Sequence, residues 1–547
     1  MEQKNALISV YDKTGIVEFA QGLKELGWDF YSSGGTATKL NDNAVPSSDV
    51  ASLVGGKAIL GHKVVTISRE LAAGELADIS NEAEMREMKE LGLPIIHLVC
   101  VDCYPLKEEI AKPGATLASV LAKTDVGGMN MLHAAAKGRR IVLCDAADRP
   151  KVLKWLQDGR PNEEEFINYL CAKAEAYCAD YELASAMFLS QNRYFGIIGE
   201  KIRDLRYGEN PQQKSFGLFE TFGGSQDPLA LSKFQVIVGD PGHINSIDLD
   251  CMLQTITHVM AGYHKNNLWQ DMGFKSKENF PYVAIGVKHG NACGAAISST
   301  SGTALMDMID GNVLSIFGGS IITNFPITEE LADIISHYRT DTKRRILDVV
   351  IAPAIEEKAK QMLMRKKDRC KMAVNPALAI MGPDCLDKGL LIKSVRGGFL
   401  VQENYHFVLD LNDDKIEIIG KQYPLQDKID LVLGSAICAT NTSNTIILTK
   451  NGKLIGSGVG QKDRLKACNL AIDIAQEAGH ITAGAIACSD SFFPFPDGPK
   501  KLINAGIKTI FTPSGSENDQ ATINIFQENN VFLIMIPNEI GRMFYGH

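Results

Sequence analysis

The sequence has no apolar run of 18 or more residues, and such a run is what a transmembrane helix requires. It also has no excess of positive charge, because 56 Lys and Arg residues face 65 Asp and Glu residues, for a net charge of −9. This balance argues against nucleic acid or an anionic membrane surface as the main partner. The apolar stretch near the start is too short for a signal peptide, so we expect a cytoplasmic protein.

Signatures of several metal and cofactor sites are also missing. The 12 Cys residues are scattered through apolar segments, which is typical of reduced structural thiols. Cys100 and Cys103 form one Cys-x-x-Cys pair, and no second pair follows to complete a zinc site. Neither a Walker A loop nor a G-x-G-x-x-G fingerprint is present. The sequence therefore argues against zinc, thiol redox and dinucleotide chemistry.

What the chain does have is length and a regular alternation of elements. At 547 residues it is too long for one hydrophobic core. Over residues 1–195, amphipathic helices alternate with short apolar strands, which we expect at 6–10, 28–31, 93–103 and 141–144. This alternation predicts a doubly wound, parallel α/β sheet. A long helix at 162–189 and a connector place a domain boundary near residue 196. The remainder, 196–547, reads as α/β with two similar lobes.

Two glycine-rich loops of the N-terminal region are suited to binding phosphate. Ser33–Thr36 lies between a strand and a helix, and Asp125–Gly128 opens another helix. Backbone N–H groups that converge at a helix start attract anions, and Lys13 and Lys137 accompany these motifs. Taken alone, each loop is equally consistent with a tight turn that needs glycine.

In the second region, a predicted buried strand, Tyr282–Val287, ends in Lys288, His289 and a glycine turn. The charge of Lys288 disfavours protonation of its neighbour, which keeps the imidazole available as a base. Taken alone, such a pair is more typical of ordinary surface.

Three further features of this region are ambiguous in the same way. Arg206, beside Tyr207, is suited to clamp a phosphate or carboxylate, and it is also an ordinary surface residue. The segment 492–495 forms either an apolar wall for a flat heterocycle or simply core. Asp348 precedes an apolar strand, where a carboxylate is also typical of a cap.

Together, however, the motifs resemble a known family. The blocks are LRYGENPQQ (205–213), VKHGNACG (287–294), SIFGGSIITN (315–324), SNT (443–445), GQKDR (460–464), SDSFFPFPDG (489–498), PSGS (513–516) and RMFYGH (542–547). In this order, and along nearly the whole chain, they resemble the bifunctional purine-biosynthesis family that joins AICAR transformylase to IMP cyclohydrolase.

The resemblance implies a fold, two reactions and their partners. Residues 1–195 would form a methylglyoxal-synthase-like domain that closes formyl-AICAR to IMP. Residues 196–547 would form two cytidine-deaminase-like lobes that transfer a formyl group from 10-formyltetrahydrofolate to AICAR. No catalytic metal is implied, since the H-x-E and P-C-x-x-C signatures of zinc deaminases are absent. Relatives form homodimers with interface active sites, so we expect a homodimer.

Matching the motifs residue by residue implies a transformylase site. His289 would be the catalytic base, Lys288 its cationic neighbour, and Asn444 the residue that orients the reacting groups. The nucleotide-binding positions would be Arg206, Tyr207, Arg542, Phe544, Ser514 and Gly515. The folate-binding positions would be Phe317, Asp348, Arg464, Pro494, Phe495 and Asp497.

The cyclohydrolase half departs further from the family. Its catalytic candidates are Lys137, Tyr104 and Asp125. The retained binding residues are Lys13, Thr14, Ser33, Gly34, Gly35, Thr36, Thr66, Gly127 and Gly128. At other family positions the chain carries Tyr11, Val65, Ser68, Asp102, His133 and Gly138, with Val65 in place of a key Lys. Lys63 shares a strand face with position 65 and is a candidate replacement.

Three functions remain open at this level. The expected one is a bifunctional enzyme. The first alternative is a transformylase whose N-terminal domain is catalytically impaired. The second is a non-catalytic purine-nucleotide sensor, against which the intact Lys288–His289 pair argues.

Overall fold

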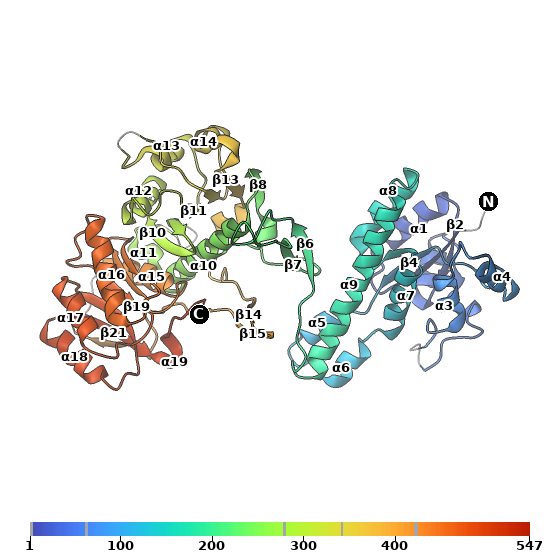
Figure 1. The fold of residues 1–547 in the computed structure, drawn as a ribbon. Helices are drawn as coiled ribbons and strands as arrows, with labels where there is room; N and C mark the ends of the chain where they lie inside the picture. Colours follow the sequence, from blue (N-terminus) through green and yellow to red (C-terminus); the bar gives the residue numbers. More distant parts are fainter. Residues whose placement is uncertain (1–3, 61–63, 277–279, 341–342, 421–424, 547) are drawn as a thin grey trace. The chain divides into compact units, whose positions relative to one another are not determined.

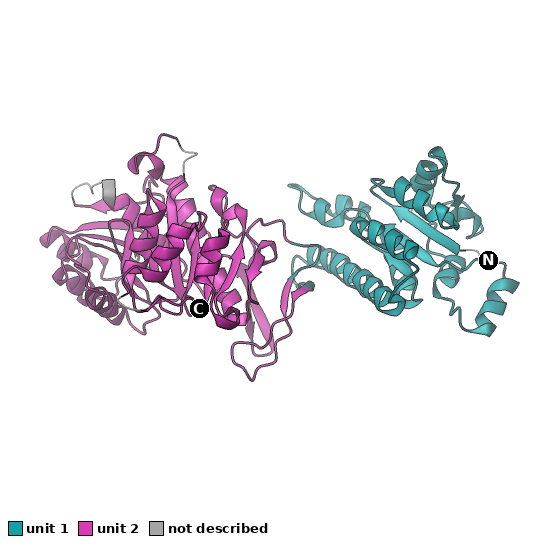
Figure 2. Cartoon of the chain, turned by 90° about the horizontal axis from the view of Figure 1, so that it is seen from above, with its two compact units in different colours: residues 1–200, 220–224 teal, residues 201–219, 225–547 magenta. Residues whose placement is uncertain are grey.

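The computed structural model describes residues 4–60, 64–276, 280–340, 343–420 and 425–546. The chain divides into two compact units, residues 1–200 with 220–224 and residues 201–219 with 225–547 (Figure 2). It passes from one unit to the other in a two-stranded ribbon, β6 (Gly199–Arg203) and β7 (Leu218–Thr221).

The first unit is built on a sheet of order β3-β2-β1-β4-β5 in which every neighbouring pair is parallel. The predicted doubly wound α/β sheet is therefore confirmed. The strands are β1 (Lys4–Val10), β2 (Trp28–Ser32), β3 (Ser48–Asp49), β4 (Leu98–Asp102) and β5 (Ile141–Leu143). The helices are α1 (Ile16–Glu25), α2 (Gly34–Asp42), α3 (Arg69–Leu76), α4 (Glu82–Glu90), α5 (Leu106–Ile110), α6 (Leu117–Ala122), α7 (Val126–Lys137), α8 (Arg149–Gln157) and α9 (Glu163–Leu189).

Local sequence explains most of these bounds, with one exception. α1 buries residues at helical spacing and ends before Gly27, whose φ of 80° favours glycine. The strand predicted over 93–103 is wrong in length, because β4 begins only at Leu98. Pro94 has no N–H for a ladder. The N–H of Ile96 instead donates to the carbonyl oxygen of Gly74 in α3, at 3.0 Å.

The order of this sheet creates a topological switch point. From β1 the chain moves to β2 and β3 on one side, and later returns to place β4 and β5 on the other side. Connections therefore leave β1 and β4 in opposite directions, which opens a crevice beyond their carboxyl ends. In open α/β sheets this crevice is the usual place for a ligand.

The second unit holds a 12-stranded mixed sheet of order β16-β21-β20-β19-β17-β18-β10-β9-β11-β12-β13-β8 within the described residues. Its first half runs β8 (Gln235–Val238), α10 (His243–Lys265), α11 (Leu268–Asp271), β9 (Tyr282–Lys288), β10 (Asn291–Ser298), α12 (Ser301–Gly311), β11 (Ser320–Thr323), α13 (Glu329–His337), β12 (Val349–Ala352), α14 (Glu357–Leu363) and β13 (Lys371–Val374). After the separate ribbon of β14 (Leu390–Val395) and β15 (Gly398–Glu403), the second half runs β16 (Glu417–Ile419), α15 (Leu425–Cys438), β17 (Ile446–Lys450), β18 (Lys453–Gly458), α16 (Arg464–Glu477), β19 (Ile486–Ser489), α17 (Asp497–Asn504), β20 (Thr509–Ser514), α18 (Asp519–Glu528), β21 (Phe532–Pro537) and α19 (Asn538–Gly541).

The two halves repeat one another. Each has an edge strand, a helix, an antiparallel hairpin, and then three strands separated by helices, with the same order in the sheet. The halves meet where β10 pairs antiparallel with β18. The predicted Asn451-Gly452 hairpin is confirmed as the turn between β17 and β18. The likeness of each lobe to cytidine deaminase remains a prediction.

Helices cover both faces of this sheet (Figure 1). One face packs on α10 and α15, whose buried residues belong to a single hydrophobic core. Thr255 of α10 and Thr440, which follows α15, are joined by a hydrogen bond of 2.9 Å. The other face packs on α12 and α13 in the first lobe and on α16 and α17 in the second. No helix in the described ranges combines the length and apolar character needed to span a bilayer.

Candidate active sites

In the first unit, the loop after β1 is fastened to the end of β4. The N–H of Tyr11 donates to the carbonyl oxygen of Asp102 at 2.9 Å, and the N–H of Asp12 donates to its carboxylate at 2.7 Å. Burial raises the pKa of the Asp102 carboxyl, and the hydrogen bond from the Asp12 N–H and the charges of Arg149 and Lys13 oppose the shift. The crevice expected from strand order is therefore bordered by the loop that contains Lys13 and Thr14.

The same loop brings a cation to the first predicted phosphate loop. The Lys13 ammonium donates to the carbonyl oxygens of Val10 and Tyr11. A Cβ added at Gly35 would lie 4.0 Å from Lys13 Cε, so this side chain passes beside the first turn of α2. Burial lowers the pKa of Lys13. Ser33 Oγ lies 2.8 Å from Ser9 Oγ and fixes the loop on β1. The arrangement offers an anion one ammonium and a helix start.

A second cluster forms at the start of α7. Asp125 caps this helix by accepting a hydrogen bond from the N–H of Gly128 at 2.7 Å, and burial raises the pKa of its carboxyl. A Cβ at Gly127 would lie 2.5 Å from Thr66 Oγ1, so only glycine permits this approach. The Tyr181 hydroxyl accepts a hydrogen bond from the Asp125 N–H at 3.0 Å and lies 3.3 Å from the Tyr104 carbonyl oxygen.

Lys123 is a residue of this cluster that the sequence reasoning missed. Its ammonium lies 3.3 Å from the Tyr11 hydroxyl, 4.9 Å from the centre of the Tyr11 ring and 5.8 Å from that of Tyr104. The two rings meet edge to face at 5.6 Å. Lys123 and Tyr11 are 112 positions apart, so no local pattern could have paired them.

Lys137, by contrast, is not brought to this cluster. It is the last residue of α7, whereas Asp125 precedes the first. At a rise of 1.5 Å per residue, about 18 Å of helix separates them. Next to it, a side chain at Gly138 would collide with the carbonyl oxygen of Glu75, so glycine is required there.

Other departures from the family also have structural explanations. Ser68 caps α3 by accepting a hydrogen bond from the Leu71 N–H at 3.1 Å. His133 lies 3.0 Å from a carboxylate oxygen of Glu175 in an exposed pair. Val65 packs against the hydrophobic core. Lys63, the candidate replacement, lies outside the described residues.

A cavity of about 870 Å³ lies within the first unit, on the side of β4 and β5. Its volume is typical of sites for small molecules. It contains one predicted catalytic residue, Tyr104, but none of the glycine loops. Its lining includes Tyr11, Asp12, Asp102, Tyr104, Arg149 and Tyr181.

In the second unit, Lys288 and His289 stand where the sequence placed them, at the end of a buried strand. His289 and Gly290 form the two-residue turn between β9 and β10, with φ of 53° and 72°. The imidazole is exposed. Lys288 Nζ donates to the carbonyl oxygen of Phe317 at 2.9 Å, which directs the ammonium toward the next loop of the same edge.

Two predicted folate residues lie beside this turn. Phe317 precedes β11 and is 46% exposed, which leaves the ring available to a ligand. Asp348 precedes β12, and its N–H donates to the carbonyl oxygen of Gly319 at 2.9 Å. Its carboxylate accepts a hydrogen bond from Arg365 Nη1 at 2.9 Å. Strand register brings these loops together, because Ser320 pairs with both Val287 and Val349.

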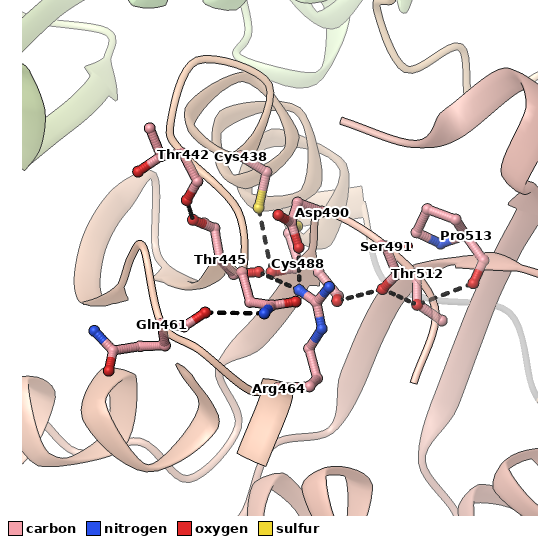
Figure 3. A network of polar contacts seen from close by, with 12 residues as sticks. Cys438, Thr442, Thr445, Gln461, Arg464, Cys488, Asp490, Ser491, Thr512 and Pro513 are labelled. Carbon is pink, nitrogen blue, oxygen red and sulfur yellow. Dashed lines mark hydrogen bonds and ion pairs between the residues drawn. The ribbon is translucent and has the colours of Figure 1, made fainter. Parts of the chain in front are cut away.

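Asn444 lies in the loop before β17. Its side-chain amide donates to the carbonyl oxygen of Gln461 at 2.9 Å. Beneath the loop, the Arg464 guanidinium pairs with the Asp490 carboxylate and donates to the Thr445 carbonyl oxygen at 3.2 Å (Figure 3). Arg464 is only 7% exposed, so in this structure the side chain supports the Asn444 loop from within.

Other predicted residues lie around the Arg464–Asp490 pair. The N–H of Met543 donates to the Asp490 carbonyl oxygen at 2.8 Å, which fixes the terminal segment here. In that segment, the Arg542 guanidinium lies 5.1 Å from the centre of the Phe544 ring. Phe495 is 61% exposed and follows Pro494, while Asp497 begins α17. Ser514 ends β20, and the N–H of Gly515 donates to Asp519 at 2.7 Å.

Strand directions place these residues and His289 on one edge of the sheet, called here the His289 edge. β10 is antiparallel to both β9 and β18, and β18 is antiparallel to β17. β17 therefore begins at the edge where β9 ends. β19 is antiparallel to β17, and β20 is parallel to β19, so both end at that edge. Three strand spacings separate β9 from β17, roughly 14 Å.

Arg206 and Tyr207 are exposed in the loop between β6 and β7, and Tyr207 is 38% exposed. The N–H of Gly208 donates to the carbonyl oxygen of Gln213 at 3.0 Å and closes this loop. As for metals, the described residues contain no group of three or more His, Cys, Asp or Glu side chains that could hold an ion.

Comparisons with known proteins cover 97% of the chain. A family model described as "AICARFT/IMPCHase bienzyme" matches residues 135–474, and one described as "MGS-like domain" matches residues 15–130. The chain is 31% identical over 541 residues to "Bifunctional purine biosynthesis protein PurH" of Acetivibrio thermocellus, with 97% of this chain and 98% of the relative covered. The protein of the same name from Bacillus cytotoxicus is 32% identical over 542 residues, with the same coverage. A solved structure titled "Crystal structure of ForH" is 34% identical over 35% of this chain and 100% of that chain, with a TM-score of 0.32.

Proposed function

The chain belongs to the AICARFT/IMPCHase bienzyme family, as its motifs predicted, and on that basis we propose that it catalyses two consecutive steps of purine biosynthesis. The second unit transfers a formyl group from 10-formyltetrahydrofolate to AICAR. The first unit closes the formyl-AICAR product to IMP, with loss of water.

Formyl transfer to AICAR needs a base because the attacking amine is a poor nucleophile. Its lone pair is delocalised into the imidazole ring, so attack on the formyl carbon is aided when a proton leaves the nitrogen at the same time. His289, exposed at the end of β9, takes that proton. General-base catalysis of this kind contributes about 10²–10⁴-fold. The adduct carries an oxyanion, which Lys288 stabilises through its ammonium.

The observation that carries this proposal is the gathering of predicted residues from both lobes on the His289 edge. His289, Phe317 and Asp348 come from the first lobe, and Asn444 and Phe495 from the second. The axes of β9 and β17 are roughly 14 Å apart, a span that side chains and two bound substrates can fill. We include in the proposal the homodimer that the family resemblance implies, in which a second copy completes each site.

The two substrates differ in the groups they need. The AICAR phosphate, at roughly −1.5 to −2 charge, needs the Arg206 guanidinium and further donors near Ser514, and the Gly515 N–H can join them only when it leaves the Asp519 carboxylate. The flat pterin of the folate needs an apolar wall and a carboxylate, which Phe495 and Asp497 supply. Arg464 acts on this site indirectly, because its buried pair with Asp490 supports the Asn444 loop.

Ring closure requires attack of the carboxamide nitrogen on the formyl carbon, a cation for the oxyanion, and an acid–base group. We assign the acid–base role to Asp125 and Tyr104, which the start of α7 and the loop after β4 bring together. Lys123 supplies the cation, since its ammonium lies over the Tyr104 ring whereas Lys137 stands at the far end of α7. Lys13 and the 33–36 loop hold the phosphate.

The test is one assay with two readouts. Purified protein is mixed with AICAR and 10-formyltetrahydrofolate, and tetrahydrofolate and IMP are measured separately. Equal molar amounts of both products are expected. Release of tetrahydrofolate with accumulation of formyl-AICAR would show an impaired first unit. Absence of tetrahydrofolate with both substrates saturating would contradict the proposal as a whole.

A further inference from the structure

A carboxylate of α10 holds the turn that contains His289. Asp248 is 7% exposed. One carboxylate oxygen accepts a hydrogen bond from the Gly290 N–H at 3.1 Å, and the other accepts one from Ser320 Oγ at 2.9 Å. Asp248 thus joins the turn after β9 to the first residue of β11.

The second lobe contains a corresponding carboxylate at the equivalent position of its own helix and hairpin. Asp430 lies on α15, the counterpart of α10, and accepts hydrogen bonds from the N–H groups of Asn451 and Gly452 at 2.9 and 2.6 Å. Asn451 and Gly452 have φ of 56° and 77°, close to the values at His289 and Gly290. Both lobes therefore contain a two-residue turn that an Asp side chain holds in place. In the first lobe, a His stands at the first position of that turn.

Electrostatics couple Asp248 to the imidazole as well. Burial raises the pKa of Asp248, while its bonds to Ser320 and Gly290 and the charge of a protonated His289 oppose that shift. The carboxylate therefore acts both on the backbone of the turn and on the ring that the turn carries.

We propose that Asp248 is the positioning residue for His289 in formyl transfer, an inference that rests on the proposed transformylase activity. Asp248 touches no substrate. Asp248 holds the turn in the position in which the imidazole of His289 contacts the AICAR amine. A displacement of about 1 Å in such a group can cost about 10²-fold in rate.

The repeat provides a matched control. Asp248→Ala is compared with Asp430→Ala, which removes the corresponding anchor from the other lobe. We expect kcat for tetrahydrofolate release to fall about 10²-fold in Asp248→Ala, with KM for AICAR little changed. Asp430→Ala should keep the wild-type kcat per folded molecule. Asp248→Asn should recover at least about tenfold, because its amide oxygen can still accept from the Gly290 N–H.

A milder variant covers the case in which Asp248→Ala fails to fold. Ser320→Ala leaves the Gly290 bond in place and frees one carboxylate oxygen, so kcat should fall about tenfold. The proposal is overturned if kcat is unchanged in a folded Asp248→Ala or, where that variant does not fold, in Ser320→Ala, and also if Asp430→Ala loses as much as Asp248→Ala.

The position of the His289 ring can also be measured in the absence of catalysis. In protein carrying ¹³C-labelled histidine, the ring signal of His289, assigned with His289→Ala, should shift or broaden in Asp248→Ala and stay unchanged in Asp430→Ala. An unchanged signal in both variants contradicts the positioning role. A wild-type protein that releases no tetrahydrofolate contradicts the proposed function alone, and the ring signal still decides the role of Asp248.

Discussion

His289 and Asn451 occupy the same position in two equivalent turns, and both have left-handed backbone, with φ of 53° and 56°. Asn-Gly is the preferred pair for a two-residue hairpin of this kind, whereas a His at its first position gives up part of that preference. The second lobe therefore has the pair that best forms the turn. The first lobe has a residue that suits chemistry.

The first prediction concerns this exchange. His289→Asn should raise the free energy of unfolding by up to about 1 kcal/mol, because Asn tolerates the left-handed region at lower cost. Asn451→His should lower it by a similar amount. Urea unfolding followed by circular dichroism measures both. A His289→Asn protein less stable than wild type would indicate that the imidazole has a structural role.

The second prediction concerns Lys123. Lys123→Met should lower the rate of IMP formation by about 10²–10³-fold, the usual cost of losing one group that stabilises an oxyanion. Tetrahydrofolate release should stay at the wild-type rate. Lys154→Met is the control, because this ammonium pairs with Asp158 on the surface of α8, 2.9 Å away. Wild-type IMP formation by Lys123→Met would remove Lys123 from the mechanism.

The third prediction is a pH dependence in the first unit. Glu75 is fully buried, neither carboxylate oxygen has a hydrogen-bond partner among the described residues, and burial raises its pKa from 4.5 to about 8. The folded state therefore binds a proton that the unfolded state releases. The contribution of Glu75 to the free energy of unfolding is fully present below pH 4.5 and is lost as the pH rises through about 8.

The slope of this loss is at most about 1.4 kcal/mol per pH unit. Glu75→Gln should abolish it, since a neutral amide does not titrate. Urea unfolding at several pH values, followed by tryptophan fluorescence, compares the two proteins. Equal slopes in wild type and Glu75→Gln would refute the assignment.

The fourth prediction concerns the buried pair beneath the Asn444 loop. Arg464→Met should lower the free energy of unfolding by about 3–5 kcal/mol, because it leaves the Asp490 charge buried without its partner. The double variant with Asp490→Asn should lose less than Arg464→Met alone. A variant of normal stability with a raised KM for the formyl donor would instead mean that Arg464 contacts the folate.

Much of this fold follows from local sequence. The strand that ends in Lys288, the Asp125 cap and the Asn451-Gly452 hairpin are each specified within a few residues. The length of β4 is not, because the partner of the Ile96 N–H is Gly74 in α3 rather than a neighbouring strand. The separation of Lys137 from Asp125 follows from the length of α7, which runs from Val126 to Lys137.

The rest depends on contacts between distant segments. The two lobes place His289 and Asn444 on one edge only because β10 pairs with β18, which local patterns do not reveal. Lys123 meets Tyr11 across 112 positions, and Asp248 reaches Gly290 across 42. Such residues are found once the order and direction of the strands are known.

The most direct test of the account is the rate of tetrahydrofolate release by His289→Ala in a single turnover, with AICAR and 10-formyltetrahydrofolate saturating. The account predicts a rate at least about 10²-fold below wild type, with AICAR bound as tightly as before. A rate equal to that of the wild type would contradict it.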